Sequence, residues 1–101
     1  MTETADTTGP LAFAASFPPD ERFAATAAEL AGRLAVSCGC AAEAAEEIRG
    51  AVHSAFRQAL ASSVPGGAGI DLTLRAEDGV FDADVTFGGA DLCHCSRVLT
   101  A

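Results

Sequence analysis

The chain has 101 residues, half of them apolar, which is enough for one small domain with a single hydrophobic core. The formal net charge is −8, and the six basic residues are all arginines scattered along the chain, so it lacks the basic patch that nucleic-acid binding requires. No stretch reaches the roughly 18 apolar residues of a membrane span, and the N-terminus does not resemble a secretion signal. We therefore expect a cytoplasmic protein that binds neither nucleic acid nor membrane.

Residues 1–9 are polar and contain nothing to bury, which predicts a disordered tail followed by a single domain over 10–101. In the run "LAFAASF", apolar residues from Leu11 to Phe17 alternate with smaller ones, as in a strand packed on one face. The prolines that follow end the strand and suit the first turn of a helix.

Two helices are predicted next. From about Asp20 the apolar residues recur at helical spacing, in the order Phe23, Ala27, Leu30 and Leu34, with Arg22, Glu29 and Arg33 toward water. Gly39 should end this helix, because glycine best adopts the left-handed conformation there. A second helix begins near Ala41 with Glu43, Glu46 and Glu47 in its first turns. It carries a stripe of Ile48, Val52, Ala55 and Ala59, and the two helices should pack antiparallel.

Residues 62–69 are rich in Gly and Pro and are predicted to form a loop that ends the helical part. The alternating runs 70–75 and 80–87 are predicted strands, and the dipeptide Asp78-Gly79 between them indicates a tight hairpin. The final "LCHCSRVLTA" fits neither helix nor strand clearly. The expected fold class is α+β, a two-layer sandwich of two antiparallel helices on a mostly antiparallel sheet.

Three segments together resemble a known family: "FPPDERF", "AEEIRGAVHSAFRQA" and "IDLTLRAEDGVFDADVTFGG". In this order, and with the Gly39 turn, they are similar to the N-terminal two-thirds of the anti-sigma-factor serine kinases, which belong to the histidine-kinase-like (GHKL) ATPase superfamily. The resemblance runs from about Leu11 to Asp91 and implies a degenerate, truncated histidine-kinase-like ATPase domain.

The resemblance also implies where nucleotide chemistry would lie. On the second helix the family has a general-base Glu and, four residues later, an Asn that holds magnesium; these positions are Ser54 and Gln58 here. A serine does not accept a proton usefully at neutral pH, so base catalysis should be lost. Gln58 keeps an amide oxygen, but one methylene farther out than magnesium geometry favours.

The family's adenine-binding turn has an Asp followed at two-residue steps by two glycines, and these positions are Phe87, Gly89 and Asp91. A phenylalanine cannot accept the adenine hydrogen bond, and too few residues remain for the family's glycine-rich lid. We expect no catalytic residue and no cofactor, with Gln58 and Gly89 as remnants of a nucleotide site. The alternative is a residual ATP- and magnesium-binding serine kinase.

Two further groups of residues could carry chemistry. The cysteines form two C-x-C pairs, Cys38 with Cys40 and Cys93 with Cys95, both of which we expect near the ends of elements. They allow a zinc- or thiol-based sensor, with His94 and Arg97 able to lower a thiol pKa, although C-x-C is not the usual zinc spacing and small buried cysteines are the simpler interpretation. His53 and Ser54 are adjacent on a helix, so their side chains should not face each other.

These observations predict a non-catalytic regulatory protein that binds other proteins in a partner-switching circuit controlling transcription. The resemblance implies a partner such as a sigma factor, an anti-sigma kinase or an antagonist, and a possible homo- or heterodimer. Four charged residues on the outward helix surfaces are the first to test as an interface: Arg22, Arg33, Glu46 and Glu47.

Overall fold

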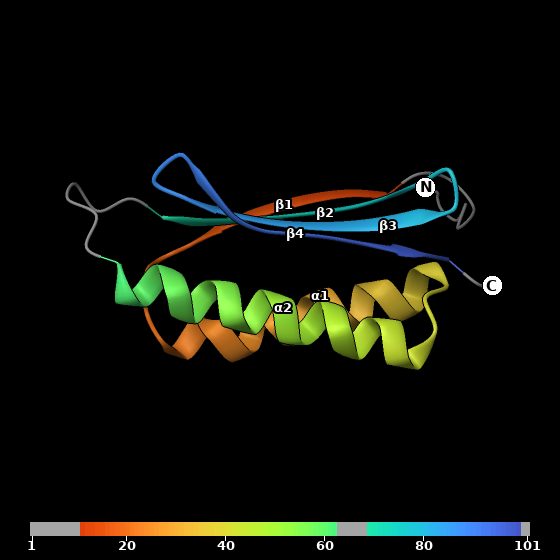
Figure 1. The fold of residues 1–101 in the computed structure, drawn as a ribbon, viewed down its shortest axis with the longest axis horizontal. Helices are drawn as coiled ribbons and strands as arrows, with labels where there is room; N and C mark the ends of the chain where they lie inside the picture. The colour runs from red at the N-terminus through yellow and green to blue at the C-terminus, as the bar shows by residue number, and fades with distance from the viewer. Residues whose placement is uncertain (1–10, 63–68, 100–101) are drawn as a thin grey trace, which may run out of the picture.

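The computed structural model describes residues 11–62 and 69–99. The predicted tail at 1–9 and most of the predicted loop at 62–69 lie outside these residues. The elements follow in the order β1 (Leu11–Phe17), α1 (Arg22–Cys38), α2 (Ala42–Ala61), β2 (Ile70–Glu77), β3 (Val80–Phe87) and β4 (Ala90–Val98). They form two layers, with the helices side by side beneath one face of the sheet (Figure 1). The predicted α+β two-layer fold is confirmed.

The sheet has the order β1-β2-β3-β4, and every neighbouring pair is antiparallel. The C-terminal stretch that fits no pattern in the sequence is therefore the edge strand β4. Its pairing with β3 contains an irregularity between Val85 and Thr86, where the register shifts by one residue. Such a shift breaks strict alternation along a strand, so the face of each β4 residue cannot be read from its own sequence.

Positive φ angles mark the tight turns. Asp78 (φ 56°) and Gly79 (φ 77°) connect β2 to β3, as the Asp-Gly signal predicts for a two-residue hairpin. Gly88 (φ 61°) and Gly89 (φ 84°) form the matching turn between β3 and β4. Gly39 (φ 113°) ends α1 as predicted, and the N–H of Cys40 then donates to the carbonyl of Ala35 (2.9 Å).

The core lies between the sheet and the helices. All four predicted residues of the α2 stripe, Ile48, Val52, Ala55 and Ala59, are buried. The stripe predicted for α1 is rotated in the structure. Of its members Ala27 is fully buried, but the large ones, Phe23, Leu30 and Leu34, are only half-buried. The other buried residues of α1 are small: Ala24, Ala28, Ala31, Gly32 and Ala35. Small side chains allow α1 to pack closely, so the larger residues lie at its flanks.

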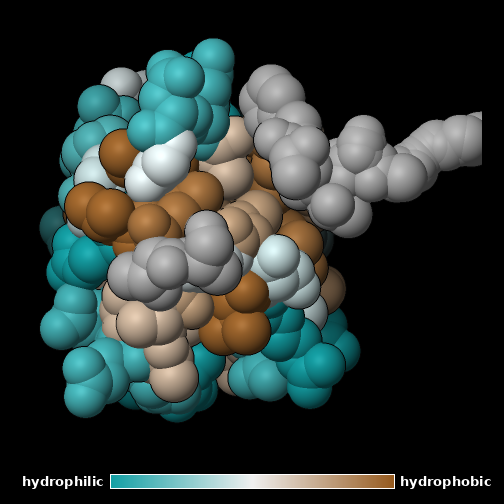
Figure 2. Space-filling view, turned by 90° about the vertical axis from the view of Figure 1, so that its right-hand side faces the viewer, coloured by the Kyte–Doolittle hydropathy of each residue, from teal (hydrophilic) through white to brown (hydrophobic). Residues whose placement is uncertain are grey.

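Large apolar side chains from both layers fill the interior. Phe56 of α2 is fully buried and meets Phe17 of β1 edge-on, with ring centroids 5.5 Å apart and an interplanar angle of 76°. From the sheet, Ile70, Leu72, Leu74, Phe81 and Val85 are fully buried as well. On the end face near the α1–α2 connection, apolar residues lie in the middle, with hydrophilic residues above and below (Figure 2).

Candidate functional site

Ser54 and Gln58, the positions at which the resemblance implies a general base and a magnesium ligand, are both exposed on α2. Helical spacing places them on the same stripe as Glu47, whose Oε1 accepts a hydrogen bond from Nε of Arg97 (2.7 Å). Because Arg97 belongs to β4, this stripe runs alongside the edge strand. The neighbouring His53 is half-buried, and no hydrogen bond joins it to Ser54 among the described residues.

Phe87, Gly89 and Asp91 lie in the hairpin that joins β3 to β4. Phe87 is 7% exposed and belongs to the hydrophobic core, as its place in the alternation of β3 predicts. Gly89 is in the two-residue turn, and Asp91 is exposed on β4. An aromatic core residue therefore occupies the position where the resemblance would require a carboxylate, and a strand follows directly.

The two C-x-C pairs approach each other at one side of the core. Cys40, in the α1–α2 connection, is buried, as is Cys95 of β4, whereas Cys38 and Cys93 are half-buried. Burial is the main cause that raises the pKa of Cys40, and the neighbouring Cys38 and Cys95 raise it further, while Arg97 acts in the opposite direction. Burial also raises the pKa of Cys38 and of Cys93, so these thiols are protonated at neutral pH.

The cysteine geometry corrects two expectations. Cys93 and Cys95 lie within β4 rather than near its end. His94, expected near a thiol, is on the exposed face of the sheet and contacts Asp84 instead. Within residues 11–62 and 69–99, no three His, Cys, Asp or Glu side chains are grouped closely enough to hold a metal ion. Small side chains that are buried or half-buried agree with a packing role for the four cysteines.

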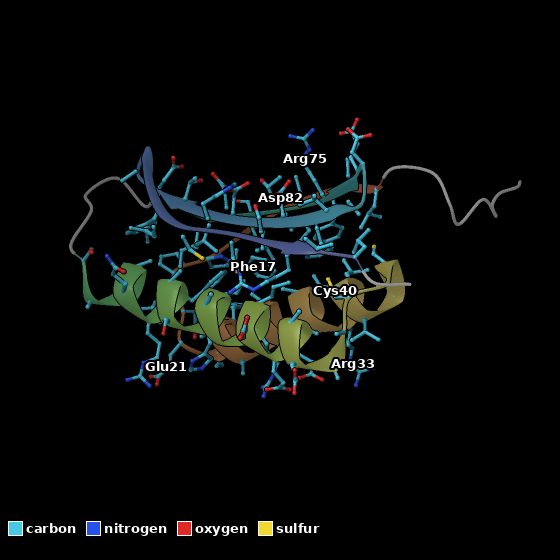
Figure 3. The ribbon with its side chains drawn as sticks, turned by 45° about the vertical axis from the view of Figure 1, so that its right-hand side comes forward. Phe17, Glu21, Arg33, Cys40, Arg75 and Asp82 are labelled. Atoms are coloured by element: carbon cyan, nitrogen blue, oxygen red, sulfur yellow. The ribbon has the colours of Figure 1, made fainter. Side chains whose placement is uncertain are left out.

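The open face of the sheet carries a group of polar residues that sequence reasoning missed. Asp82 and Asp84 of β3 lie opposite Ser96 and His94 of β4 in the register. Nδ1 of His94 is in hydrogen-bonding contact with Oδ1 of Asp84, and the Ser96 hydroxyl donates to Oδ1 of Asp82. Oγ of Ser96 also lies 3.3 Å from Nε2 of His94. We call these four residues the β3–β4 polar cluster. Asp82, with Arg75 beside it, points away from the helices (Figure 3).

Carboxylates dominate the electrostatics of this cluster. The hydrogen bond to Asp84 is the main cause that raises the pKa of His94, and the charges of Asp84, Asp82 and Asp91 act in the same direction. The His94 side chain is 64% exposed and that of Asp84 34%. In the sequence, the signal is a D-x-D on one strand and an H-x-S on the next, since residues two apart share a face.

The outer face of the helix layer contains an open groove between α1 and α2. It is lined by Gly32, Arg33 and Val36 from one helix and by Ala45, Glu46 and Arg49 from the other. Val36 is 54% exposed there. Two ion pairs lie along the groove: Arg33 contacts Glu29 (3.1 Å), and Arg49 contacts Glu46 (2.7 Å).

Of the four residues predicted as a first interface to test, Arg33 and Glu46 thus line one groove. The other two lie elsewhere. Arg22, the first residue of α1, pairs with Asp20 (2.8 Å), and Glu47 pairs with Arg97.

Comparison of the sequence with models of protein families gave no match, and comparison with curated proteins gave none either. Among the described residues, neither helix is both long enough and apolar enough to cross a membrane.

Proposed function

We propose that the protein is a non-catalytic relative of the anti-sigma-factor serine kinases. It would act by protein–protein binding within a partner-switching circuit that regulates transcription. The observation that carries the proposal is the burial of Phe87 in the core at the position of the adenine-binding carboxylate. An adenine ring would have to displace this side chain, and no carboxylate would be there to accept a hydrogen bond from the adenine amino group.

The remaining motif positions support the loss of nucleotide chemistry. Ser54 cannot act as a general base at neutral pH, and Gln58 is exposed on the same helix face. Only Gly88 and Gly89 separate β3 from β4, so the hairpin has no segment that could close over phosphates. General bases and phosphate-binding groups are each worth orders of magnitude in rate, so losing them together removes kinase activity.

For the binding surface, the groove between α1 and α2 is the best candidate. It combines an exposed apolar side chain, Val36, with two flanking acid–base pairs, and such a mixture of an apolar centre and a charged rim is typical of transient interfaces. A protein segment with an apolar residue for Val36 and charged residues for Arg33 and Glu46 would fit it. A sigma factor, an anti-sigma kinase or an antagonist is the expected class of partner.

The test combines a pull-down from the native cell with calorimetry. A captured regulator should lose affinity at least about ten-fold with the variant Arg33→Glu/Val36→Asp, because a buried apolar contact and a charge pair are both removed. Arg22→Glu is the matched control, since Arg22 is an exposed arginine of the same helix outside the groove. Equal loss with both variants would contradict this surface.

Two other readouts separate the alternatives. Micromolar, magnesium-dependent binding of ATP in calorimetry would contradict the proposal and favour a residual serine kinase. One equivalent of zinc in protein purified without chelator would favour a zinc-based sensor that uses Cys38, Cys40, Cys93 and Cys95. Zinc well below one equivalent would exclude that sensor.

A further inference from the structure

The β3–β4 polar cluster contains a serine, a histidine and a carboxylate in a continuous chain of contacts. A carboxylate can only accept a hydrogen bond, so the contact with Asp84 places a proton on Nδ1 of His94. The opposite ring nitrogen, Nε2, lies 3.3 Å from Oγ of Ser96. This is the order of contacts by which a hydroxyl becomes a nucleophile: the carboxylate orients the imidazole, and the imidazole takes the hydroxyl proton.

Backbone pairing explains why these side chains meet. The N–H of Leu99 donates to the carbonyl of Gly79 (2.8 Å), so this is a hydrogen-bonded pair of the antiparallel ladder. Such pairs alternate with non-hydrogen-bonded ones, and the register then makes Asp82↔Ser96 and Asp84↔His94 non-hydrogen-bonded pairs. Side chains approach most closely in pairs of this type.

The same alternation orients the backbone of Ser96. In a non-hydrogen-bonded pair the N–H points away from the partner strand, and in the described sheet β4 has a neighbour on one side only. The Ser96 N–H therefore points to the open edge of the sheet. It can donate to an oxygen that develops negative charge next to Oγ.

We propose that the β3–β4 polar cluster is a hydrolytic site for small acyl esters, with Ser96 as nucleophile, His94 as general base and Asp84 orienting the histidine. Oγ of Ser96 forms a bond to the ester carbonyl carbon while its proton passes to Nε2 of His94. The carbon–oxygen bond of the ester breaks, and the leaving alkoxide takes that proton. Water then attacks the acyl-serine with His94 again as base, releasing the carboxylic acid and restoring the Ser96 hydroxyl.

Asp82 competes with His94 for the hydroxyl. In the structure Ser96 donates to Asp82, and the 3.3 Å contact suits an imidazolium whose Nε2–H donates to Oγ. Once Nε2 loses its proton it becomes an acceptor, and the hydroxyl can turn to it. Hydrolysis should therefore rise with pH as His94 becomes neutral, and removal of Asp82 should increase it at a given pH.

The charged residues around the cluster determine which esters it would prefer. Three carboxylates face His94, namely Asp82 and Asp84 from β3 and Asp91 from β4, and Arg75 of β2 lies opposite Asp82. The surplus of negative charge repels anionic esters and favours neutral or cationic ones. The exposed, open setting offers a substrate few contacts and does not exclude water, so turnover should be slow and the Michaelis constant high.

The first experiment uses the purified full chain with 4-nitrophenyl acetate and a fluorophosphonate label. Mass spectrometry should find the label on Ser96. Ser96→Ala and His94→Gln should each lower kcat/KM by at least about a hundred-fold, the low end of what general acid–base catalysis contributes. Ser16→Ala is the control, since Ser16 is an exposed serine on the same face in β1 and should leave the rate unchanged.

The second experiment tests the roles of the carboxylates. Asp82→Ala should raise the rate and move the midpoint of its pH profile to lower pH, which a purely structural role would not do. Among acetyl esters of phenols, a trimethylammonium substituent should be preferred to a sulfonate one, and this preference should weaken with salt.

Two results would overturn the site: an unlabelled Ser96, or hydrolysis by Ser96→Ala at the wild-type rate. If the label or the acyl group is found only on cysteine thiols, Ser96 is unlabelled and the site is likewise overturned. The cluster and the α1–α2 groove lie on opposite outer faces of the molecule (Figure 3). Ser96→Ala should therefore bind the partner as the wild type does. Measuring partner binding by this variant separates failure of the hydrolytic site from failure of the proposed regulatory function.

Discussion

Phe56 shows how much of the stability rests on one side chain. It is fully buried in α2 and packs edge-on against Phe17 of β1, joining the two layers. Phe56→Ala removes most of that side chain and leaves a cavity, which should lower the free energy of unfolding by about 3–5 kcal/mol. Urea denaturation measures the change. Val98→Ala is the comparison, because Val98 is 68% exposed and its truncation should cost less than about 0.5 kcal/mol. Equal effects would contradict the packing described.

His94 should make stability depend on pH. Its pKa is raised in the folded protein by Asp84, so the stabilisation is fully present below the unfolded-state value of 6.5 and is lost as pH rises through the higher folded-state pKa. We expect the difference in urea midpoint between wild type and His94→Gln to be larger at about pH 5.5 than at about pH 9. The residue is exposed, so added salt should reduce the difference. A difference that grows with pH would contradict the contact.

At the scale of the element, backbone conformation decides whether a glycine can be replaced by alanine without loss of stability. Gly39 ends α1 with φ 113°, where an L side chain is strained, so Gly39→Ala should lower the free energy of unfolding by about 1 kcal/mol or more. Gly50 is exposed within α2, and a Cβ there would meet nothing within 4 Å. Gly50→Ala should instead stabilise the protein by about 0.5–1 kcal/mol. Thermal unfolding of both variants checks the two signs.

The elements with strong local signals were predictable from the sequence. Gly39, the helical stripe of α2 and the Asp78-Gly79 turn each combine a local conformational preference with a clear period, and the structure confirms all three. The strand β4 has no such signal. Its mixture of His, Cys, Ser and Arg gives no clean alternation, and the irregularity opposite Val85 and Thr86 shifts its faces. Its conformation depends on pairing with β3, which is a tertiary effect.

The β3–β4 polar cluster was missed for the same reason. The outward direction of Asp82 and Asp84 follows from the alternation of β3, but their partners depend on whether residues 92–101 form a strand and in which register. A one-residue slip would put the cysteines opposite the two aspartates. The spacing within H-x-S is local information, whereas the contact with Asp84 is not.

At the scale of the whole molecule, the two-layer architecture places the two proposed sites on opposite faces. The helices bury one face of the sheet and leave the other face, with the polar cluster, open to water (Figure 1). Their own outer surface carries the groove with Arg33 and Glu46. The layers thus place the proposed partner-binding surface and the proposed hydrolytic site far apart, so variants at one should not alter the other.

The whole architecture, rather than three substitutions, should prevent nucleotide binding. Ser54 and Gln58 are exposed, so Ser54→Glu/Gln58→Asn should keep the wild-type free energy of unfolding within about 0.5 kcal/mol. Adding Phe87→Asp places a carboxylate at a 7%-exposed core position and should cost about 3 kcal/mol or more. Calorimetry with ATP and magnesium should detect no binding by either variant.

The reason lies in the connection between the last two strands. Gly88 and Gly89 form a complete turn, and β4 pairs with β3 from Ala90 onward, so these two residues are the whole connection between the strands. Restored motif residues at this hairpin would still lack a segment between β3 and β4 that could cover the phosphates. Micromolar binding of ATP by the double variant, with Phe87 still in the core, would mean that the pocket survives beside α2 and that only its ligating residues have changed.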